Sequence, residues 1–286
     1  MRRYGKQLLV FLIVLLVSGV SAFGQQQPVR KITNIAGDLY RFQNRFHFSV
    51  FLVTRAGIIA TDPINADAAR WLKTELKKRF NQPVKYLIYS HDHADHSSGG
   101  EVFSDTAVVV AHERAKATII GEKRPTAVPD ITFSDRMTVE LGGKTVDLVY
   151  VGRGHSDNMI AMNFRAERAL FAVDFVEVKS VAYKKLNDSY FPEWMDAIKV
   201  IEGIDFDILV TGHGPMGKKR DARDHRAYLD DLYAAVLKAA RAGKTLEEMQ
   251  QGIKLEKYKE WNQYKQWMPL NIEGLYRNIQ LHRRGN

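Results

Sequence analysis

Three histidines and two aspartates lie within six residues, in the stretch His91–His96 with the sequence HDHADH. A mostly apolar run, Val84–Tyr89, comes shortly before this stretch. Imidazole nitrogens and carboxylate oxygens are donors that suit zinc. The stretch therefore predicts a metal-binding loop near the end of a buried strand.

Within this loop, the spacing indicates two neighbouring metal positions. His91 and His93 are two residues apart on an extended segment, so their side chains point the same way. Asp95 and His96 can turn towards a second position beside the first. One loop could thus supply donors to two metal ions.

Three further residues follow β-like runs elsewhere in the chain. His155 follows the run Thr145–Val151 in a glycine turn, Asp174 closes Leu170–Val173, and His213 lies in the segment Thr-Gly-His-Gly-Pro. Glycine lets the backbone come close to a ligand. With the loop, these residues give five histidines and two carboxylates, enough for two catalytic metals that each keep an open position.

Plainer explanations apply to some of these residues taken singly. A lone His213 could be an ordinary loop histidine, and Asp174 could cap a turn; Asp62 could do the same or support a metal ligand indirectly. We expect structural roles for the remaining histidines, which are His47, His112, His225 and His282.

The elements that must position these residues alternate between strands and helices in the first half and are mainly strands after Pro129. Residue patterns predict strands at 39–42, 48–54, 57–61, 84–89, 107–111, 137–141, 145–151, 158–164, 169–173 and 207–211. They predict helices at 66–80, 100–103, 112–120 and 192–202 and from 218 onwards. Two β-sheets faced by helices fit this order.

Together the motifs resemble those of the metallo-β-lactamase-fold hydrolase superfamily, from about Ile32 to Asp224. The chain carries H-x-H-x-D-H, G-x-G-H-S, V-D-F and G-H-G-P in that order. The resemblance implies an α/β fold, a four-layer αββα sandwich of two mixed β-sheets faced by helices. Residues 32–224 would form the hydrolase domain, and 225–286 a helical extension packed on it.

The resemblance also implies a dinuclear zinc centre and a role for each of its residues. His91, His93 and His155 would hold one zinc ion, Asp95, His96 and His213 the second, and Asp174 would bridge them. A water shared by two such cations loses a proton near neutral pH, and the hydroxide can attack a carbonyl group. Asp95 would orient the hydroxide and carry its proton. Iron and manganese are alternatives, since nitrogen and oxygen donors do not enforce zinc.

Two departures from the cysteine-containing β-lactamases bear on the substrate. The chain has no cysteine, and Asp174 stands where that subclass has a thiolate. Glu177 stands where it has a lysine, and Lys179 is displaced by two residues. The pattern is more similar to glyoxalase II-like thioesterases and lactonases. His93, where a diiron oxidoreductase branch has glutamate, favours zinc hydrolysis.

We therefore expect a hydrolase that acts on an ester, thioester or lactone in a small molecule. Alternatives are a β-lactam hydrolase, a phosphodiesterase or nuclease, and a non-enzymatic metal-binding accessory protein of a periplasmic oxidation system. The positive charges are dispersed among acidic residues, which argues against a nucleic-acid partner.

The N-terminus predicts a secretory signal peptide at residues 1–24, cleaved near Gly24/Gln25, and a flexible spacer at 25–31. Basic residues precede the apolar stretch Leu8–Val20, which is too short for a comfortable membrane span. We expect a periplasmic or secreted protein without stable membrane insertion after cleavage; the alternative is an uncleaved N-terminal anchor. Removal of Arg2, Arg3 and Lys6 with this segment lowers the formal net charge from +9 to +6.

Residues around the substrate are only weakly indicated by the sequence. Candidates for substrate contact are Arg153, Asn158 and Tyr183, and residues 46–48 could form a hydrophobic flap over the site. The aromatic segment 261–268 predicts either core packing or a dimer face. The oligomeric state does not follow from these patterns.

Overall fold

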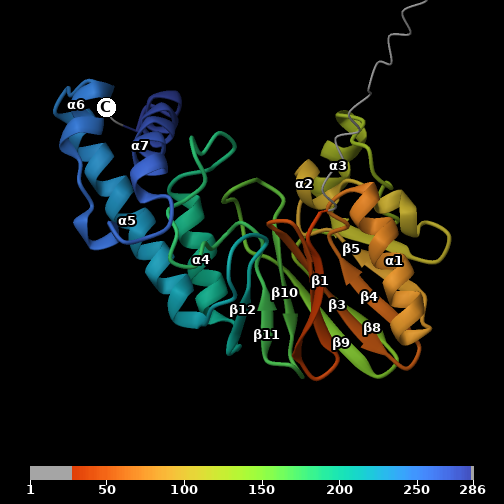
Figure 1. Cartoon of the computed structure of the whole chain (residues 1–286). Helices are drawn as coiled ribbons and strands as arrows, with labels where there is room; N and C mark the ends of the chain where they lie inside the picture. The colour runs from red at the N-terminus through yellow and green to blue at the C-terminus, as the bar shows by residue number, and fades with distance from the viewer. Residues whose placement is uncertain (1–27, 285–286) are drawn as a thin grey trace, which may run out of the picture.

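Two β-sheets pack face to face in the computed structural model, which describes residues 28–284 (Figure 1). The first sheet has the order β1-β2-β3-β4-β5-β6-β7. Its strands are Arg30–Ala36, Leu39–Asn44, His47–Thr54, Gly57–Thr61, Val84–Ile88, Val108–His112 and Ile131–Phe133. Neighbours from β1 to β4 are antiparallel, and those from β4 to β7 are parallel, so the sheet is mixed.

The second sheet is also mixed. Its order is β12-β11-β10-β9-β8, and only the pair β11 and β12 is parallel. The strands are β8 (Arg136–Leu141), β9 (Lys144–Tyr150), β10 (Ile160–Phe164), β11 (Ala169–Phe171) and β12 (Ile208–Val210). Every residue of β10 and β11 is buried, as expected for central strands covered on both faces.

Helices cover the outer faces of both sheets. The α-helices are α1 (Ala66–Phe80), α2 (Ala94–Ser97), α3 (Glu113–Gly121), α4 (Glu193–Gly203), α5 (Lys219–Arg241), α6 (Leu246–Gly252) and α7 (Tyr264–Leu281). The 3-10 helices η1 (Gly100–Phe103) and η2 (Glu256–Tyr258) are single turns. Helices α1 and α3 lie beside the first sheet, and α4 and α5 beside the second (Figure 1).

Three apolar layers hold this arrangement together. One lies between α1, α3 and the first sheet, one between the sheets, and one between the second sheet and the C-terminal helices. Leu72, Ile59 and Leu229 are examples from the three layers, and each is almost completely buried. The predicted four-layer αββα sandwich is confirmed.

Helix α1 shows how local sequence sets an element. The side chain of Asn65 accepts a hydrogen bond from the backbone N–H of Ala68, which satisfies a free donor of the first turn. Leu72 and Leu76, one turn apart, face the sheet. The helix ends before Asn81, whose backbone is left-handed. The helix therefore spans the predicted range 66–80.

Some sequence-based boundaries differ from the structure. Strands β1 and β7 were not predicted; β1 is an edge strand with polar residues on both faces, and β7 has only three residues. Strand β1 begins inside the expected spacer 25–31, at Arg30. The division expected at residue 224 falls within the continuous helix α5. The predicted signal peptide, 1–24, lies outside the described residues. Among the helices of residues 28–284, none has the length and apolarity needed to cross a membrane.

Candidate metal centre

The loops that carry the predicted metal ligands follow the carboxyl ends of four strands. The HDHADH loop follows β5, and His155, Asp174 and His213 follow β9, β11 and β12. These strands belong to both sheets, and the loops meet at one rim of the sandwich. The fold therefore brings together residues separated by more than a hundred positions in the chain.

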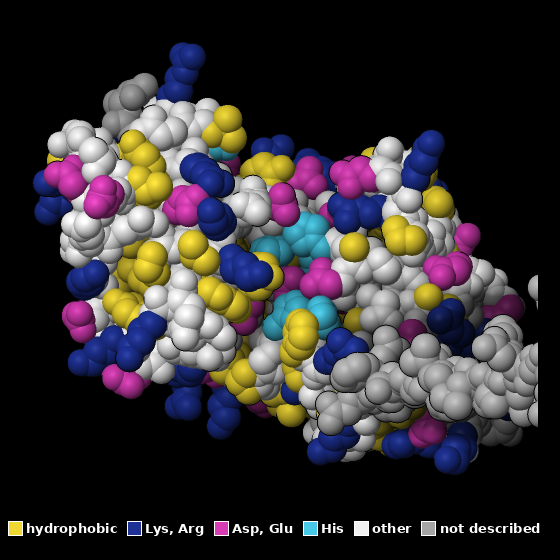
Figure 2. Space-filling view, turned by 45° about the horizontal axis from the view of Figure 1, so that its top comes forward, with side chains coloured by type: hydrophobic (Ala, Val, Ile, Leu, Met, Phe, Trp, Pro, Cys, Tyr) yellow, Lys and Arg dark blue, Asp and Glu magenta, His cyan; other side chains and the backbone are white. Residues whose placement is uncertain are grey.

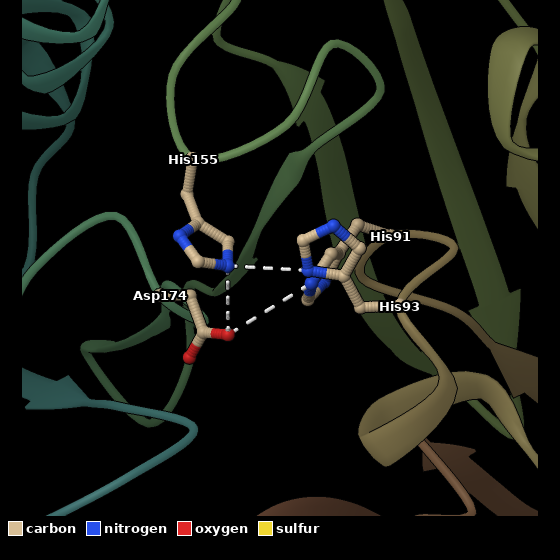
Figure 3. A group of neighbouring side chains, drawn as sticks. All are labelled: His91, His93, His155 and Asp174. Atoms are coloured by element: carbon tan, nitrogen blue, oxygen red, sulfur yellow. Dashed lines mark hydrogen bonds and ion pairs between the residues drawn. The ribbon is translucent and has the colours of Figure 1, made fainter. Parts of the chain in front are cut away.

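His91, His93, His155 and Asp174 form the inner group of ligands (Figure 3). One donor atom from each side chain lies within 4.8 Å of the donors of the others. His155 Nε2 lies 3.1 Å from His93 Nδ1 and 3.7 Å from Asp174 Oδ2. His91 Nε2 lies 3.8 Å from the same Asp174 oxygen, and the His91 side chain is fully buried.

A second group shares Asp174 with the first. It consists of His96, Asp174 and His213, whose donor atoms also lie within 4.8 Å of one another. His96 Nε2 lies 3.2 Å from His213 Nε2 and 3.2 Å from Asp174 Oδ2. Asp174 therefore stands between the two groups, where its predicted bridging role requires it.

Asp95 lies beside the second group, together with His47, for which the sequence predicts only a structural role. Asp95 Oδ2 is 3.5 Å from His213 Nε2, 3.6 Å from His96 Nε2 and 3.4 Å from His47 Nε2. His47, Asp95 and His213 form a third set of possible metal donors. The structure thus brings all seven predicted residues together and adds His47.

Backbone pairing explains why His47 reaches the centre. His47 begins β3 and forms an isolated antiparallel bridge with His213, and the backbone N–H of Phe48 donates to the carbonyl oxygen of Gly212 at 2.9 Å. A Cβ at position 212 would lie 2.8 Å from His96 Cε1, so glycine permits this close approach. No short sequence motif predicts this contact between His47 and His213, which lie far apart in the sequence.

Further contacts fix the loop that carries the HDHADH motif. Asn158 accepts a hydrogen bond from the Asp92 backbone N–H at 3.0 Å and donates to Asp92 Oδ1 at 2.7 Å. Arg124 binds the other oxygen of the Asp92 side chain at 2.9 Å. Asn158 is buried in this role, so it holds the loop and is not a substrate-contact residue as the sequence had suggested.

Most of the histidines have a partner on the nitrogen that faces away from the centre. Ser90 Oγ lies 2.9 Å from His91 Nδ1, and the Phe46 carbonyl oxygen lies 3.2 Å from His213 Nδ1. Two carboxylates lie at ion-pair distance, without a hydrogen bond, from the corresponding nitrogens of two further histidines. Asp62 Oδ2 lies 3.6 Å from His96 Nδ1, in the supporting position considered for it, and Asp188 Oδ2 lies 3.5 Å from His93 Nε2. Such partners orient metal-binding imidazoles.

The electrostatics of the inner group favour a cation. Burial lowers the pKa of His91 well below its ordinary value and lowers that of His155 to about 4, so both are neutral at pH 7. Burial opposes ionisation of Asp174, but the surrounding histidines, His96 first, hold its pKa well below the ordinary value. Neutral imidazole and ionised carboxylate are the forms that bind metals.

We call His96, His213 and Asp95 the rim side of the centre. Its negative charge also favours binding of a cation. Burial would raise the pKa of Asp95, but His213 and His47 hold it well below its usual range. Burial lowers the pKa of His96, whereas Asp174 and Asp62 outweigh this effect and raise it. Asp62 and Asp174 beside His96 are buried carboxylates, and such groups need compensating positive charge.

Unsatisfied donor atoms fit the same conclusion. His91 Nε2 and Asp174 Oδ1 are buried and have no hydrogen-bond partner among the described residues. Buried polar atoms are usually paired, so these two require another partner. A divalent metal ion matches their positions, the oxygen and nitrogen donors, and the charge of the site.

A cavity of about 1260 Å³ opens beside the centre, and histidine and acidic side chains are visible in the hollow in Figure 2. Glu177 lines it, and burial, with Asp174, raises the pKa of that carboxyl to about 8. Tyr183 also lines it, whereas Arg153 packs over Tyr190, away from the cavity lining. Of the expected flap, Phe46 and His47 face the cavity.

Comparison with known proteins identifies the family to which this centre corresponds. Residues 63–213 match the family model described as the Metallo-beta-lactamase superfamily, which is more than half of the chain. This range contains all seven predicted ligands.

Among curated proteins, the chain is 27% identical to the 2,4-dinitroanisole O-demethylase subunit alpha of Nocardioides sp. (strain JS1661), over 79% of this chain and 70% of that protein. It is 25% identical to the metallo-beta-lactamase type 2 of Elizabethkingia meningoseptica, over 78% of this chain and 94% of that protein.

Solved structures show the same fold at lower sequence identity. The metallo-beta-lactamase from Pontibacter korlensis superposes with a TM-score of 0.65 at 22% identity, covering 71% of this chain and 99% of that one. The metallo-beta-lactamase from Hirschia baltica gives a TM-score of 0.63 at 14% identity, covering 69% and 96%.

Proposed function

The chain belongs to the metallo-beta-lactamase superfamily, and from this membership we propose that it is an exported dinuclear zinc hydrolase that cleaves an ester, thioester or lactone. Members of this superfamily are metal-dependent hydrolases that act on small molecules. The observation that carries the proposal is Asp174, which is shared by two adjacent groups of donor atoms at the wall of a large cavity.

The proposed ligands divide between two metal positions with one shared residue. The first position would be held by His91, His93 and His155 and the second by Asp95, His96 and His213, and Asp174 would serve both. When bound, two such cations would act as Lewis acids that lower the pKa of water and polarise a carbonyl group.

Asp95 is the residue of this chain that we assign to the attacking water. Its side chain is half exposed, lines the cavity and stays ionised, so it can accept a hydrogen bond from the water and orient its lone pair towards the substrate. Hydrolysis adds the hydroxyl group to the acyl carbon as the C–O or C–S bond breaks, and the water's proton goes to the leaving oxygen or sulfur. Asp95 is placed to pass that proton on.

The surroundings of the centre favour this substrate class. Glu177, with its raised pKa, lines the cavity three residues after Asp174, where a lysine would be needed to bind an antibiotic carboxylate in the manner of the cysteine-containing subclass. A carboxyl group at this position offers such an anion no positive charge. β-Lactam hydrolysis is nevertheless the second candidate, because relatives that align over most of this chain are metallo-beta-lactamases.

A substrate panel with metal analysis tests the proposal. The purified chain is loaded with zinc, its metal content is measured, and it is assayed on a lactone, a thioester, a β-lactam, bis(p-nitrophenyl) phosphate and 2,4-dinitroanisole. The last compound appears in the name of the relative from Nocardioides, a 2,4-dinitroanisole O-demethylase subunit. We expect two equivalents of metal and the fastest turnover on the lactone or thioester.

Other outcomes of the panel point elsewhere. Faster turnover of the β-lactam would favour the second candidate, and turnover of the phosphate diester would favour a phosphodiesterase. Two bound metals without turnover of any compound would contradict the hydrolase and favour the metal-binding accessory protein. A chelator-treated sample is the control for each assay.

Export is proposed from the sequence of the first 24 residues. Expression of the full chain in a Gram-negative host, followed by N-terminal sequencing of the protein in the periplasmic fraction, tests it. We expect the mature chain to begin near Gln25. Recovery of the uncleaved chain in the cytoplasm would contradict this.

A further inference from the structure

One part of the cavity wall is largely apolar. It is formed by Val178, Tyr183 and Leu186 from the loop after Asp174, and by Trp267 and Leu270 from α7. We call these five residues the outer wall. Tyr183 and Trp267 contact each other edge to face, with ring centroids 5.1 Å apart. The two segments of the outer wall therefore join at an aromatic pair.

Exposed aromatic side chains are concentrated at this cavity. Phe46 is 66% exposed and Tyr183 is 51% exposed, and among residues 28–284 they are the aromatic side chains that stand out as exposed large hydrophobic groups. Both line the cavity, Phe46 from the hairpin between β2 and β3 and Tyr183 from the loop after Asp174. Exposed apolar groups that gather around one hollow mark a ligand-binding site, because a ligand would remove them from water.

Helix α7 holds the outer wall in place. Asn271 is buried, and its Nδ2 donates to the carbonyl oxygens of Ala182 at 2.9 Å and Lys184 at 2.6 Å. Three residues further along the helix, a Cβ at Gly274 would lie 1.7 Å from the Lys185 carbonyl oxygen, so the loop packs directly on the helix backbone. The shape of the wall thus depends on the C-terminal segment.

The basic residues near the outer wall are already engaged. Lys179 pairs with Asp224, and Lys185 Nζ lies 2.9 Å from Glu273 Oε1. Lys184 Nζ lies 4.8 Å from the centre of the Tyr183 ring, a cation–π contact. The outer wall is therefore better suited to binding a neutral apolar group than to binding an anion.

The size of the cavity sets the scale of that group. Its volume of about 1260 Å³ exceeds the range of roughly 300–1,000 Å³ that is typical of small-molecule sites. A substrate as small as an acetate ester would leave most of this space, and the outer wall, in contact with water.

We infer that the outer wall is a substrate-binding subsite for a bulky apolar group, of aromatic size or larger, attached to the ester, thioester or lactone bond. This inference rests on the proposed hydrolase function and adds the class of substrate. The metal centre acts on the bond, while Trp267 and Leu270 select the group carried by it.

Two series of thioesters test this inference on the zinc-loaded protein. One varies the acyl group from acetyl to hexanoyl to naphthylacetyl with a constant thiol, and the other varies the thiol with a constant acetyl group. We expect kcat/KM to rise in one series, by up to about fourfold for each methylene that becomes buried. Equal kcat/KM across both series would overturn the inference.

Substitutions in α7 test whether a preference for bulky substrates depends on the outer wall. Trp267→Ala and Leu270→Ala should lower the ratio of kcat/KM for the bulky substrate to that for acetyl, mainly through KM. Gln280→Ala is the matched control, because this exposed residue lies on the same helix away from the cavity. An unchanged ratio in both wall variants, with their folding verified by circular dichroism, would also overturn the inference.

A binding measurement separates this inference from the proposed function. Naphthylacetamide, a neutral amide, is titrated into the same proteins by calorimetry. Binding that Trp267→Ala weakens, in a protein that cleaves no ester, thioester or lactone, would leave the subsite intact and contradict the proposed reaction. Hydrolysis without a size preference, and without binding of the amide, would leave the reaction intact and contradict the subsite.

Discussion

The two sides of the metal centre differ in how deeply they lie in the fold. On the inner side, His91 is fully buried and the His93 and His155 side chains are less than one-fifth exposed. On the rim side, His96 is also fully buried, but the Asp95 side chain is 47% exposed and that of His213 is 26% exposed. A buried set of donors is held by packing on all sides, whereas a rim set leaves room for water and substrate. We therefore expect the inner half of the proposed centre to retain metal and the rim half to admit water and substrate.

The supports of the two sides differ as well. The inner side is backed by the second sheet and by Trp194, whose ring centroid lies 5.9 Å from that of His155. The rim side depends on the hairpin between β2 and β3, which reaches His213 through the bridge to His47. We therefore expect metal to be held more tightly on the inner side.

Removal of the residue shared by both sides should have the largest effect. Asp174→Ala takes a donor from both groups and leaves the buried histidines without their carboxylate, so we expect loss of both metal equivalents and of measurable hydrolysis. Metal analysis after dialysis and the thioester assay measure this. Asp105→Ala, at an exposed ion pair with Lys73, is the control. Two metal equivalents retained in a folded Asp174→Ala protein would remove the basis for treating the sides as linked.

Asp95→Asn should separate chemistry from metal retention. The amide keeps the shape of the side chain but lacks the charge that orients and transfers a proton, so turnover should fall by about 10²–10⁴-fold. Most of the metal should remain, since the inner group is untouched. Steady-state kinetics and metal analysis on one preparation provide the comparison. Wild-type turnover at full metal content would exclude the assigned role.

His47→Phe tests whether the rim side uses an additional donor. The aromatic ring preserves packing against Phe46, with which His47 is in contact at 4.5 Å between ring centroids, but offers no nitrogen to the centre. We expect only the more weakly held metal to be affected, with an affinity lower by about 10–100-fold, the range seen when residues that support metal ligands are changed. Chelator competition measures both affinities. Gln43→Ala, on the same hairpin, is the control; an equal loss at both positions would contradict the division into two sides.

The packing behind the inner side contains His225, and this residue should make the free energy of unfolding depend on pH in the acidic range. His225 is fully buried beside Trp194, and burial lowers its pKa to about 3. The unfolded chain binds this proton with a pKa near 6.5, so the unfolded state holds more protons between these values and the free energy of unfolding decreases as the pH falls from about 6.5 towards 3. At neutral pH the group has no such effect.

Urea unfolding of the metal-free protein at pH 7.5 and pH 4.5 measures that contribution. His225→Leu should lose less stability between the two pH values than the wild type does, and the difference between the two proteins cancels the titration of the metal-binding histidines. His282→Leu, just after α7, is the control. The same pH dependence in His225→Leu and wild type would show that this histidine does not titrate as its burial requires.

The sequence predicts those parts of the site whose residues lie within short local motifs. The HDHADH loop and the three residues that follow strands were found because each motif is local and the family order is recognisable. His47 and Asp188 were not found as part of the centre, because they reach it through strand pairing and through the loop beyond Asp174. The strands β1 and β7 were missed because an edge strand with mixed polarity and a three-residue strand carry little periodicity.

The aromatic segment near the C-terminus shows a further limit. Sequence alone left core packing and a dimer face open for residues 261–268. Met268 is buried in the core, whereas Trp267 is partly buried and also lines the cavity. A single helical turn therefore contributes to the core and to the cavity wall, and hydrophobic pattern by itself does not separate these two roles.

The hydrogen bonds from Asn271 to the loop after Asp174 have a consequence for selectivity. The seven predicted ligands lie within residues 63–213, while the helix that shapes the outer wall, Tyr264–Leu281, comes after them. Changes confined to α7 would therefore alter the proposed subsite, and with it the compounds accepted, without altering any of the seven predicted ligands.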